Sequence, residues 1–300
     1  MSSQQNAIVV GAGTMGTTLA RLMATHGLSV TVIDTSQETL ARCRDRLVHD
    51  PGAAARVAFA SEWCPGRAVD VVVESVTENI AVKRQVIEQA EAHVDSDTLI
   101  MTNTSGLSID EIGESMAHPE RFVGAHFFNP ADVIPAVEVV PGSPTHPAAV
   151  ERACQLLRRL GKRPAVLSRC VPGFVANRIQ HAIMRECLHL IEQGVVEPAA
   201  LDDIVKYSIG IRMAINGPLR QRDLNGLDTH LNIARYLYDD LSSSRTPAKL
   251  LENHVAEGFL GAKAGRGFYE WSEAELAAQS RQEREQLTHI LSLIDSERDA

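Results

Sequence analysis

Three glycines near the start of the chain constrain its fold more than any other feature. They follow the apolar run AIVV at residues 7–10, and an amphipathic stretch, MGTTLARLMATHG, comes next. In a strand–turn–helix unit the first glycine permits a tight turn, the second lets a phosphate approach the backbone, and the third lets the helix pack closely on the strand. The helix N-terminus then offers N–H donors to phosphate groups. The spacing predicts a dinucleotide site made of Gly11, Gly13, Thr14, Met15 and Gly16.

An acidic residue at the end of the next predicted strand supports this interpretation. Asp34 lies about twenty residues beyond the glycines, where a carboxylate accepts hydrogen bonds from ribose hydroxyls. Thr35 and Ser36 follow it, and no arginine stands next to it to hold a 2′-phosphate. We therefore expect NAD rather than NADP as the cofactor. Taken without this context, the glycines are also compatible with an ordinary turn between a strand and a helix.

Short β-branched segments alternate with helical patterns through the first half of the chain. Near-continuous apolar strands separated by amphipathic helices are typical of a parallel sheet covered on both faces. After SRCVPGFVANR the strand patterns fade and helical patterns dominate, with Pro172-Gly173 as a candidate hinge. We predict an α/β fold, with a Rossmann-like doubly wound sheet at residues 1–170 and an all-helical C-terminal domain at 171–300. The predicted strands are residues 7–10, 29–34, 69–75, 98–103, 121–128 and 136–140.

Composition narrows the possible classes of function. The net charge of −9 opposes non-specific binding to nucleic acid or to an anionic membrane. No apolar run approaches the length needed to cross a bilayer, and MSSQQN lacks the features of a secretory signal. The five cysteines lack C-x-x-C spacing, and the histidines lack metal-ligand spacing. We expect a cytoplasmic protein with reduced thiols and no metal site.

A histidine and a glutamate frame the mostly apolar segment GAHFFNPADVIPAVEVV. His126 ends one predicted strand, Asn129-Pro130 breaks the run, and Glu138 lies on the returning strand. This order allows the two side chains to meet at one end of the sheet. Histidine is suited to take a proton near neutral pH, and a carboxylate beside it fixes its tautomer. The alternative is a half-buried histidine and an unrelated surface glutamate.

Seven motifs together carry a resemblance to a known family. They are GAGTMG, VVVESVTENIAVKRQV, TNTSGLSI, GAHFFNP with VEVV, PGFVANRI, GPLRQRDLNGLD and GAKAGRGFYEW. In this order and spacing, the chain resembles the L-3-hydroxyacyl-CoA dehydrogenase family over nearly its whole length. The resemblance implies an NAD-dependent oxidoreductase of fatty acid metabolism that interconverts 3-hydroxyacyl and 3-oxoacyl thioesters. It also implies a homodimer formed through the C-terminal domain.

The same resemblance assigns roles to individual residues. His126 becomes the general base and Glu138 its partner. Ser105 and Asn177 become hydrogen-bond donors to the reacting oxygen, whose charge changes during the step. All four of these residues are intact, which disfavours a non-catalytic NAD-binding relative. The expected cofactor contacts outside the glycine loop are Asp34, Glu78, Lys83, Asn103, Asn129 and Lys263.

The chain departs from the family pattern in three places. Family members usually have a long, lysine-bearing helical hairpin after the position of Asp34, and this hairpin contacts the CoA nucleotide. Here we expect only one helix in this segment. The second arm of the hairpin is largely missing, and the segment contains no lysine. Arg220 and Arg222 intrude after Gly-Pro, where the family is normally apolar and acidic. Gly106 replaces a serine that many relatives have, a change that we expect to widen the pocket.

These departures leave the substrate open. The shortened hairpin is compatible with neutral trimming of a loop. It is also compatible with a thioester on an acyl carrier protein, or with a small free hydroxy acid or anion. Arginine is suited to a carboxylate or phosphate, so Arg220 and Arg222 are candidate substrate-anion residues. Their alternative is a solvated or salt-bridged helix face.

Overall fold

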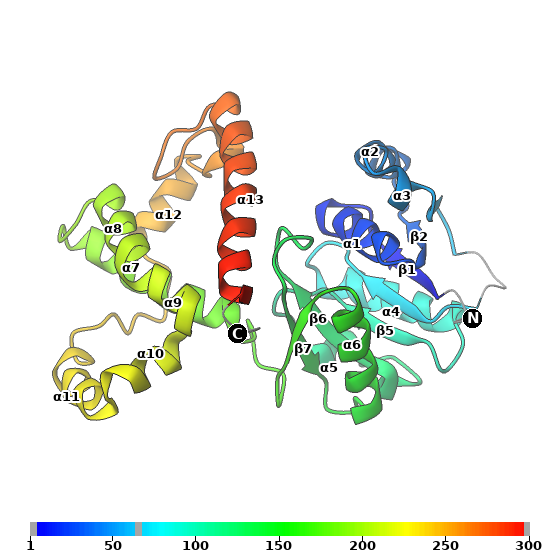
Figure 1. Cartoon of the computed structure of the whole chain (residues 1–300), viewed down its shortest axis with the longest axis horizontal. Coiled ribbons are helices and arrows are strands. Elements are labelled where there is room, and N and C mark those ends of the chain that lie inside the picture. Colours follow the sequence, from blue (N-terminus) through cyan, green and yellow to red (C-terminus); the bar gives the residue numbers. More distant parts are fainter. Residues whose placement is uncertain (1–4, 64–67, 297–300) are drawn as a thin grey trace. The chain divides into compact units, whose positions relative to one another are not determined.

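The computed structural model describes residues 5–63 and 68–296. The chain divides into two compact units, residues 1–178 and 179–300, and Figure 1 labels most of the helices and strands of each. Cys64 and the first four residues of MSSQQN lie outside the described residues; the other cysteines are free thiols. No helix in the described part of the chain is both long enough and apolar enough to cross a membrane.

One eight-stranded sheet forms the centre of the first unit, in the order β3-β2-β1-β4-β5-β6-β7-β8. The strands from β3 to β6 are parallel, β7 runs antiparallel to β6, and β8 is parallel to β7. The first six strands have the order of a doubly wound dinucleotide-binding sheet. The strands are β1 (Asn6–Val10), β2 (Ser29–Ile33), β3 (Val57–Ala60), β4 (Val71–Glu74), β5 (Leu99–Thr102), β6 (Phe122–Phe127), β7 (Ala136–Pro141) and β8 (Arg163–Val166).

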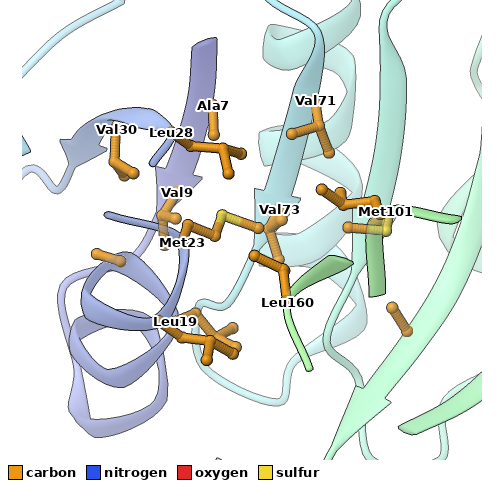
Figure 2. Close-up of a cluster of buried hydrophobic side chains, with 14 of the residues drawn as sticks. Ala7, Val9, Leu19, Met23, Leu28, Val30, Val71, Val73, Met101 and Leu160 are labelled. Carbon is orange, nitrogen blue, oxygen red and sulfur yellow. The ribbon is translucent and has the colours of Figure 1, made fainter. Parts of the chain in front are cut away.

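Helices cover both faces of this sheet because its strands are apolar on both sides. On one face, Val9 and Val73 pack with residues of α1, α2 and α6; Figure 2 shows Leu19 and Met23 over these strands. On the other face, Val72 packs with residues of α4 and α5. The predicted α/β doubly wound fold is confirmed. The helices of this unit are α1 (Thr14–Thr25), α2 (Gln37–Leu47), α3 (Pro51–Ala54), α4 (Ile80–His93), α5 (Ile109–Ile112), η1 (Pro119–Arg121) and α6 (Pro147–Arg159).

Two strands were not predicted. Both β3 and β8 have four residues, and β8 contains Pro164, which is tolerated because this strand lies at the edge of the sheet. The expected shortening of the helical hairpin is visible, since α3 has only four residues and β3 follows. Ser36 and Asp50 cap α2 and α3 by accepting hydrogen bonds from backbone N–H groups of the first turn.

The second unit is helical, as predicted, but has almost no interior of its own. Among its residues up to 294, only Leu188 and Leu201 are buried. The helix α7 begins within the first unit and continues into the second. The remaining helices are α8 (Pro198–Ile204), a π-helical turn η2 (Val205–Gly210), α9 (Ile211–Asn216), α10 (Pro218–Asn225), α11 (Leu227–Leu237), α12 (Lys249–Ala256), η3 (Ala262–Ala264) and α13 (Glu273–Ser296), after α7 (Ala176–Glu192).

The segment between β8 and α7 is bound to the first unit. The backbone N–H of Gly173 donates to the carbonyl of Gly106, and two N–H groups at the start of α7 donate to Glu138. The compact unit therefore extends to Arg178, past residue 170. The division of the chain into two functional domains at residue 170 stays a prediction.

Candidate active site

The glycine loop at the carboxyl end of β1 has the shape that a pyrophosphate requires. Gly11 has φ +102°, and a β-carbon there would lie 2.5 Å from the carbonyl oxygen of Ser75. A β-carbon on Gly16 would overlap the carbonyl oxygen of Gly11, so the helix packs against the turn. The space beside Gly13 is open, and α1 has no side-chain cap at its N-terminus. The N–H groups of the first turn of α1 are therefore available to an anion.

Asp34 follows β2 and closes this loop. Its Oδ2 accepts a hydrogen bond from the N–H of Ala12 at 2.8 Å, and its Oδ1 accepts one from Ser36 at 2.9 Å. The carboxylate thus lies beside the glycine turn, as the predicted ribose contact requires.

Three charged residues form a network at the carboxyl end of β4. Lys83 is fully buried, and its Nζ donates to Glu74 Oε1 at 2.8 Å and to the carbonyl of Val76 at 3.4 Å. Glu78 Oε2 lies 3.3 Å from the same Nζ. These partners surround the ammonium group, so the charge of Lys83 is paired mainly with the two glutamates. Its direct contact with the cofactor stays a prediction.

Glu78 connects this network to the loop that carries Ser105. Its Oε1 accepts hydrogen bonds from Thr104 Oγ1 at 2.7 Å and from the N–H of Ser105 at 2.8 Å. Ser105 is exposed, and its carbonyl oxygen accepts a hydrogen bond from Asn177 Nδ2 at 2.6 Å. Asn103 ties neighbouring strands, because its Oδ1 accepts the N–H of Phe127 at 3.0 Å.

His126 and Glu138 face each other across the antiparallel pair β6 and β7. Their backbones are paired in register, His126 Nδ1 lies 2.8 Å from Glu138 Oε2, and both side chains are buried. A carboxylate acceptor places the ring proton on Nδ1 and leaves Nε2 with a free lone pair. The ring of Phe128 lies beside the imidazole, with ring centroids 4.5 Å apart. The two side chains therefore interact directly and are not two unrelated polar residues.

The loop between β6 and β7 is anchored on both sides. Asp132 forms an ion pair with Arg21 of α1, and the buried Lys162 donates to the carbonyl of Ile134 at 3.1 Å. Burial lowers the pKa of Lys162, and the nearby Asp132 partly offsets this. Asn129, a predicted cofactor contact, is exposed in this loop and precedes a cis proline.

Comparison with known proteins identifies the family. The NAD binding domain of 3-hydroxyacyl-CoA dehydrogenase matches residues 6–170, and the C-terminal domain of the same family matches residues 173–271. The chain belongs to the 3-hydroxyacyl-CoA dehydrogenase family. The predicted family, the NAD cofactor and the assignment as an NAD-dependent oxidoreductase are confirmed at this level.

Members of the family with different named substrates resemble the chain. The 5-formyl-3-hydroxy-2-methylpyridine 4-carboxylate 5-dehydrogenase of Mesorhizobium japonicum is 31% identical, over 97% of this chain and 98% of that one. A crystal structure of the dehydrogenase of this name, described as an NAD+ dependent dismutase, is 30% identical, with a TM-score of 0.91 over 97% and 99% of the two chains. A probable 3-hydroxybutyryl-CoA dehydrogenase of Bacillus subtilis is 32% identical over 89% and 97%. The (S)-3-hydroxybutyryl-CoA dehydrogenase of Ralstonia eutropha is 32% identical, with a TM-score of 0.72 over 90% and 100%.

Two buried residues that contact the predicted site residues were not predicted from the sequence. Glu74 ends the apolar run VVVE and is fully buried, where Thr102 Oγ1 donates to its Oε2 at 2.5 Å. A carboxylate at the end of a buried strand needs a partner, and that was the available signal. Phe174 is fully buried against His126, with ring centroids 5.7 Å apart. No sequence pattern distinguished it from an ordinary core residue.

Three predicted site residues belong to the second unit. Lys263 lies in η3, and Arg220 and Arg222 lie on α10. Both arginines are exposed, and among the described residues neither forms an ion pair, so the salt-bridged alternative to anion binding is not observed. The widening of the pocket expected from Gly106 stays a prediction. A β-carbon there would lie 2.9 Å from Gly173 Cα, so this glycine admits a neighbouring turn.

The described residues hold no group of three or more histidine, cysteine, aspartate or glutamate side chains suited to a metal ion.

Proposed function

We propose that the chain oxidises a carbon that bears a hydroxyl group, with His126 as the general base. The observation that carries this proposal is the buried pair of His126 Nδ1 and Glu138 Oε2, 2.8 Å apart. It lies at the carboxyl end of β6, on the same edge of the sheet as the glycine loop after β1. This edge is where open α/β sheets bind their ligands.

The residues at this edge fit the steps of the reaction. Bound NAD supplies the acceptor for the hydride that leaves the reacting carbon. His126 Nε2 takes the hydroxyl proton, and Glu138 then stabilises the imidazolium through Nδ1–H. Ser105 and Asn177 supply polar side chains for the reacting oxygen. Glu78, held between Lys83 and the Ser105 N–H, fixes the loop that carries this serine.

The substrate that we favour is a small molecule with its own carboxylate. The resemblance places a lysine-bearing hairpin that contacts CoA in the segment after Asp34, and two arginines of this segment are engaged locally. Arg42 forms an ion pair with Glu38 at 3.0 Å, and the Arg44 guanidinium lies 4.8 Å from the ring centre of Phe59. In the second unit, Arg220 and Arg222 remain available to bind a carboxylate.

The similarity to the pyridine carboxylate dehydrogenase supports the same substrate class. That protein acts on a formyl group, according to its name. A formyl group that adds water presents a carbon bearing both a hydrogen and a hydroxyl group. His126 is suited to take a proton from such a hydrate, as from an alcohol. We therefore include aromatic formyl and hydroxymethyl carboxylates in the proposed class.

The second candidate substrate is a 3-hydroxyacyl thioester, carried on CoA or on an acyl carrier protein. The family itself and the relatives named 3-hydroxybutyryl-CoA dehydrogenase favour it. A role in fatty acid metabolism would follow from this candidate and not from the first.

Steady-state turnover with NAD+ separates the candidates. The panel consists of 3-hydroxybutyryl-CoA, its pantetheine-truncated thioester, free 3-hydroxybutyrate and an aromatic hydroxymethyl carboxylate. We expect the highest kcat/KM on a free carboxylate, and we expect Arg220→Gln or Arg222→Gln to raise its KM while Arg235→Gln does not. A higher kcat/KM on the CoA thioester than on every free carboxylate would establish the second candidate instead.

The catalytic assignment is tested with His126→Gln. Removing the base lowers kcat by about 10²- to 10⁴-fold while NADH affinity, measured by fluorescence, stays unchanged. His26→Gln is the control, because His26 lies in the same unit and its Nδ1 lies 2.8 Å from the carbonyl oxygen of Leu22 at the end of α1. Full turnover in His126→Gln would exclude this mechanism.

We further propose that two copies of the chain associate through the second unit. Large apolar side chains are more than half exposed on successive helices of this unit, including Ile204, Ile211, Leu224 and Leu231. Exposed apolar surface of this extent is typical of an interface between subunits. A homodimer would cover it.

A further inference from the structure

The turn that precedes α7 has a backbone conformation that is rare for residues with side chains. Gly173 has φ +73° and Phe174 has φ +49°. A β-carbon disfavours this left-handed region, yet Phe174 is a bulky residue and is fully buried. Such a conformation persists only where surrounding contacts fix it, and it is found mainly at functional sites. The contacts of this turn therefore indicate its role.

The turn contacts both members of the catalytic pair. The rings of Phe174 and His126 meet edge to face, with centroids 5.7 Å apart and planes at 61°. The N–H groups of Val175 and Ala176 both donate to Glu138 Oε1 at 3.0 Å. Glu138 thus gives one oxygen to His126 and the other to the turn.

The turn also contacts the loop that carries Ser105. The N–H of Gly173 donates to the carbonyl of Gly106 at 3.3 Å, and a β-carbon on Gly106 would lie 2.9 Å from Gly173 Cα. Asn177, just beyond the turn, donates to the carbonyl of Ser105. One short segment therefore reaches Ser105, His126 and Glu138.

We propose that Phe174 is a positioning residue for His126, held in place by the turn Gly173–Ala176. Phe174 and Phe128 occupy the space beside the imidazole and restrict its rotation, while Glu138 selects the nitrogen that carries the proton. Nε2 then stays directed to the substrate. The strained backbone has a function, because it brings the phenylalanine ring to the imidazole while its neighbours bind Glu138. This inference rests on the proposed role of His126 as the base.

The test compares two buried phenylalanines of the same core cluster. Phe174→Leu removes the ring beside the imidazole, and Phe122→Leu removes a buried ring at the other end of β6. Phe174→Leu lowers kcat by about 10²-fold, the scale expected for a misplaced catalytic group, with substrate KM and NADH affinity little changed. It also alters the pH profile of kcat. Phe122→Leu changes neither beyond the effect of reduced stability.

A second variant separates the ring from the turn. Phe174→Gly relieves the left-handed strain and removes the ring. If the ring positions the base, this variant is as slow as Phe174→Leu. If the shape of the turn is all that matters, it keeps the rate of the wild type, and the inference fails.

The Gly106 contact supplies an independent variant with a matched control. Gly106→Ala forces the turn away from its place and reproduces part of the kcat loss of Phe174→Leu. Gly113→Ala is the control, because its added β-carbon would also lie 2.9 Å from an atom, Phe122 Cδ1, in a part of the sheet remote from the dyad. Equal rates in the two alanine variants would contradict the proposal.

A readout that does not depend on turnover completes the test. In ¹⁵N-histidine-labelled protein, the signals of His126, assigned by their loss in His126→Gln, report which ring nitrogen is protonated. The wild type shows one tautomer, protonated on Nδ1, and Phe174→Leu shows a mixture. If His126→Gln is inactive but Phe174→Leu matches Phe122→Leu in rate and spectrum, the proposed function stands and Phe174 has no positioning role. An active His126→Gln variant would overturn both.

Discussion

The two units of the chain differ sharply in how they are held together. In the first unit, helices pack on both faces of the sheet, and residues such as Val9, Leu19 and Val73 are fully buried. The second unit has comparable apolar residues, but up to residue 294 only Leu188 and Leu201 are buried. The first unit therefore stabilises itself, whereas the second needs another surface to cover its apolar side chains.

This difference matches the division of labour that we propose. A base, its carboxylate and an oxygen-binding loop need fixed separations, and a packed sheet provides them. Exposed helices with arginines and leucines are suited to association and to binding an anion. Trp63 lies in the first unit and Trp271 in the second, so variants that keep one tryptophan allow each unit to be followed by fluorescence.

The largest expected effect comes from breaking a buried interaction of the first unit. Lys83→Met leaves Glu74 as an unpaired carboxylate with no exposure and lowers the free energy of unfolding of this unit by about 3–5 kcal/mol. Urea unfolding followed at Trp63 measures this loss. The double variant Lys83→Met, Glu74→Gln recovers part of it, and a loss reported equally by Trp271 would contradict the independence of the two units.

A smaller effect is expected from a charge on the exposed apolar surface of the second unit. Leu231→Glu, at 54% exposure, halves the mass measured by sedimentation and removes the concentration dependence of Tm. Val48→Glu, at 62% exposure in the first unit, changes neither quantity. Wild-type protein that sediments as a single chain would rule out the proposed dimer.

The smallest effect concerns a hydrogen bond within the second unit. Tyr269 Oη donates to Asp202 Oδ2 at 2.6 Å, and this bond raises the pKa of Tyr269 to about 12. A raised phenol pKa means that the bond stabilises the fold below the ordinary pKa near 10. This stabilisation is lost as the pH rises through about 12. Tyr269→Phe lowers stability by less than about 1 kcal/mol at neutral pH. The difference between the absorbance titrations of the wild type and the variant gives the ionisation of the Tyr269 phenol. A midpoint near pH 10 would show that Tyr269 does not form this hydrogen bond.

The sequence predicts much of the first unit because its signals are local. The glycine spacing, the apolar strands and the placement of His126 and Glu138 on successive strands each depend on a short stretch of chain. The roles of Glu74 and Phe174 were not predictable in this way. The surroundings of Glu74 depend on a lysine nine residues later and on a threonine of the next strand, 28 residues away. The position of Phe174 depends on a positive φ value that its residue type does not predict.

The second unit was predicted less well for a related reason. Its all-helical character was predicted, but no bounds were predicted for α9 and α10, whose side chains include no buried residue. Where packing partners lie outside the chain, the pattern of one chain is incomplete.

The shared carboxylate of Glu138 limits how this enzyme can be rebuilt. The turn that leads into α7 has two N–H groups, of Val175 and Ala176, that donate to the same carboxylate that contacts His126, the proposed base. A chimaera that replaces the second unit with that of another protein must therefore preserve the turn Gly173–Ala176. On the proposed mechanism, a donor helix that begins one residue earlier or later would misplace these N–H groups, so a variant could bind a new substrate without converting it.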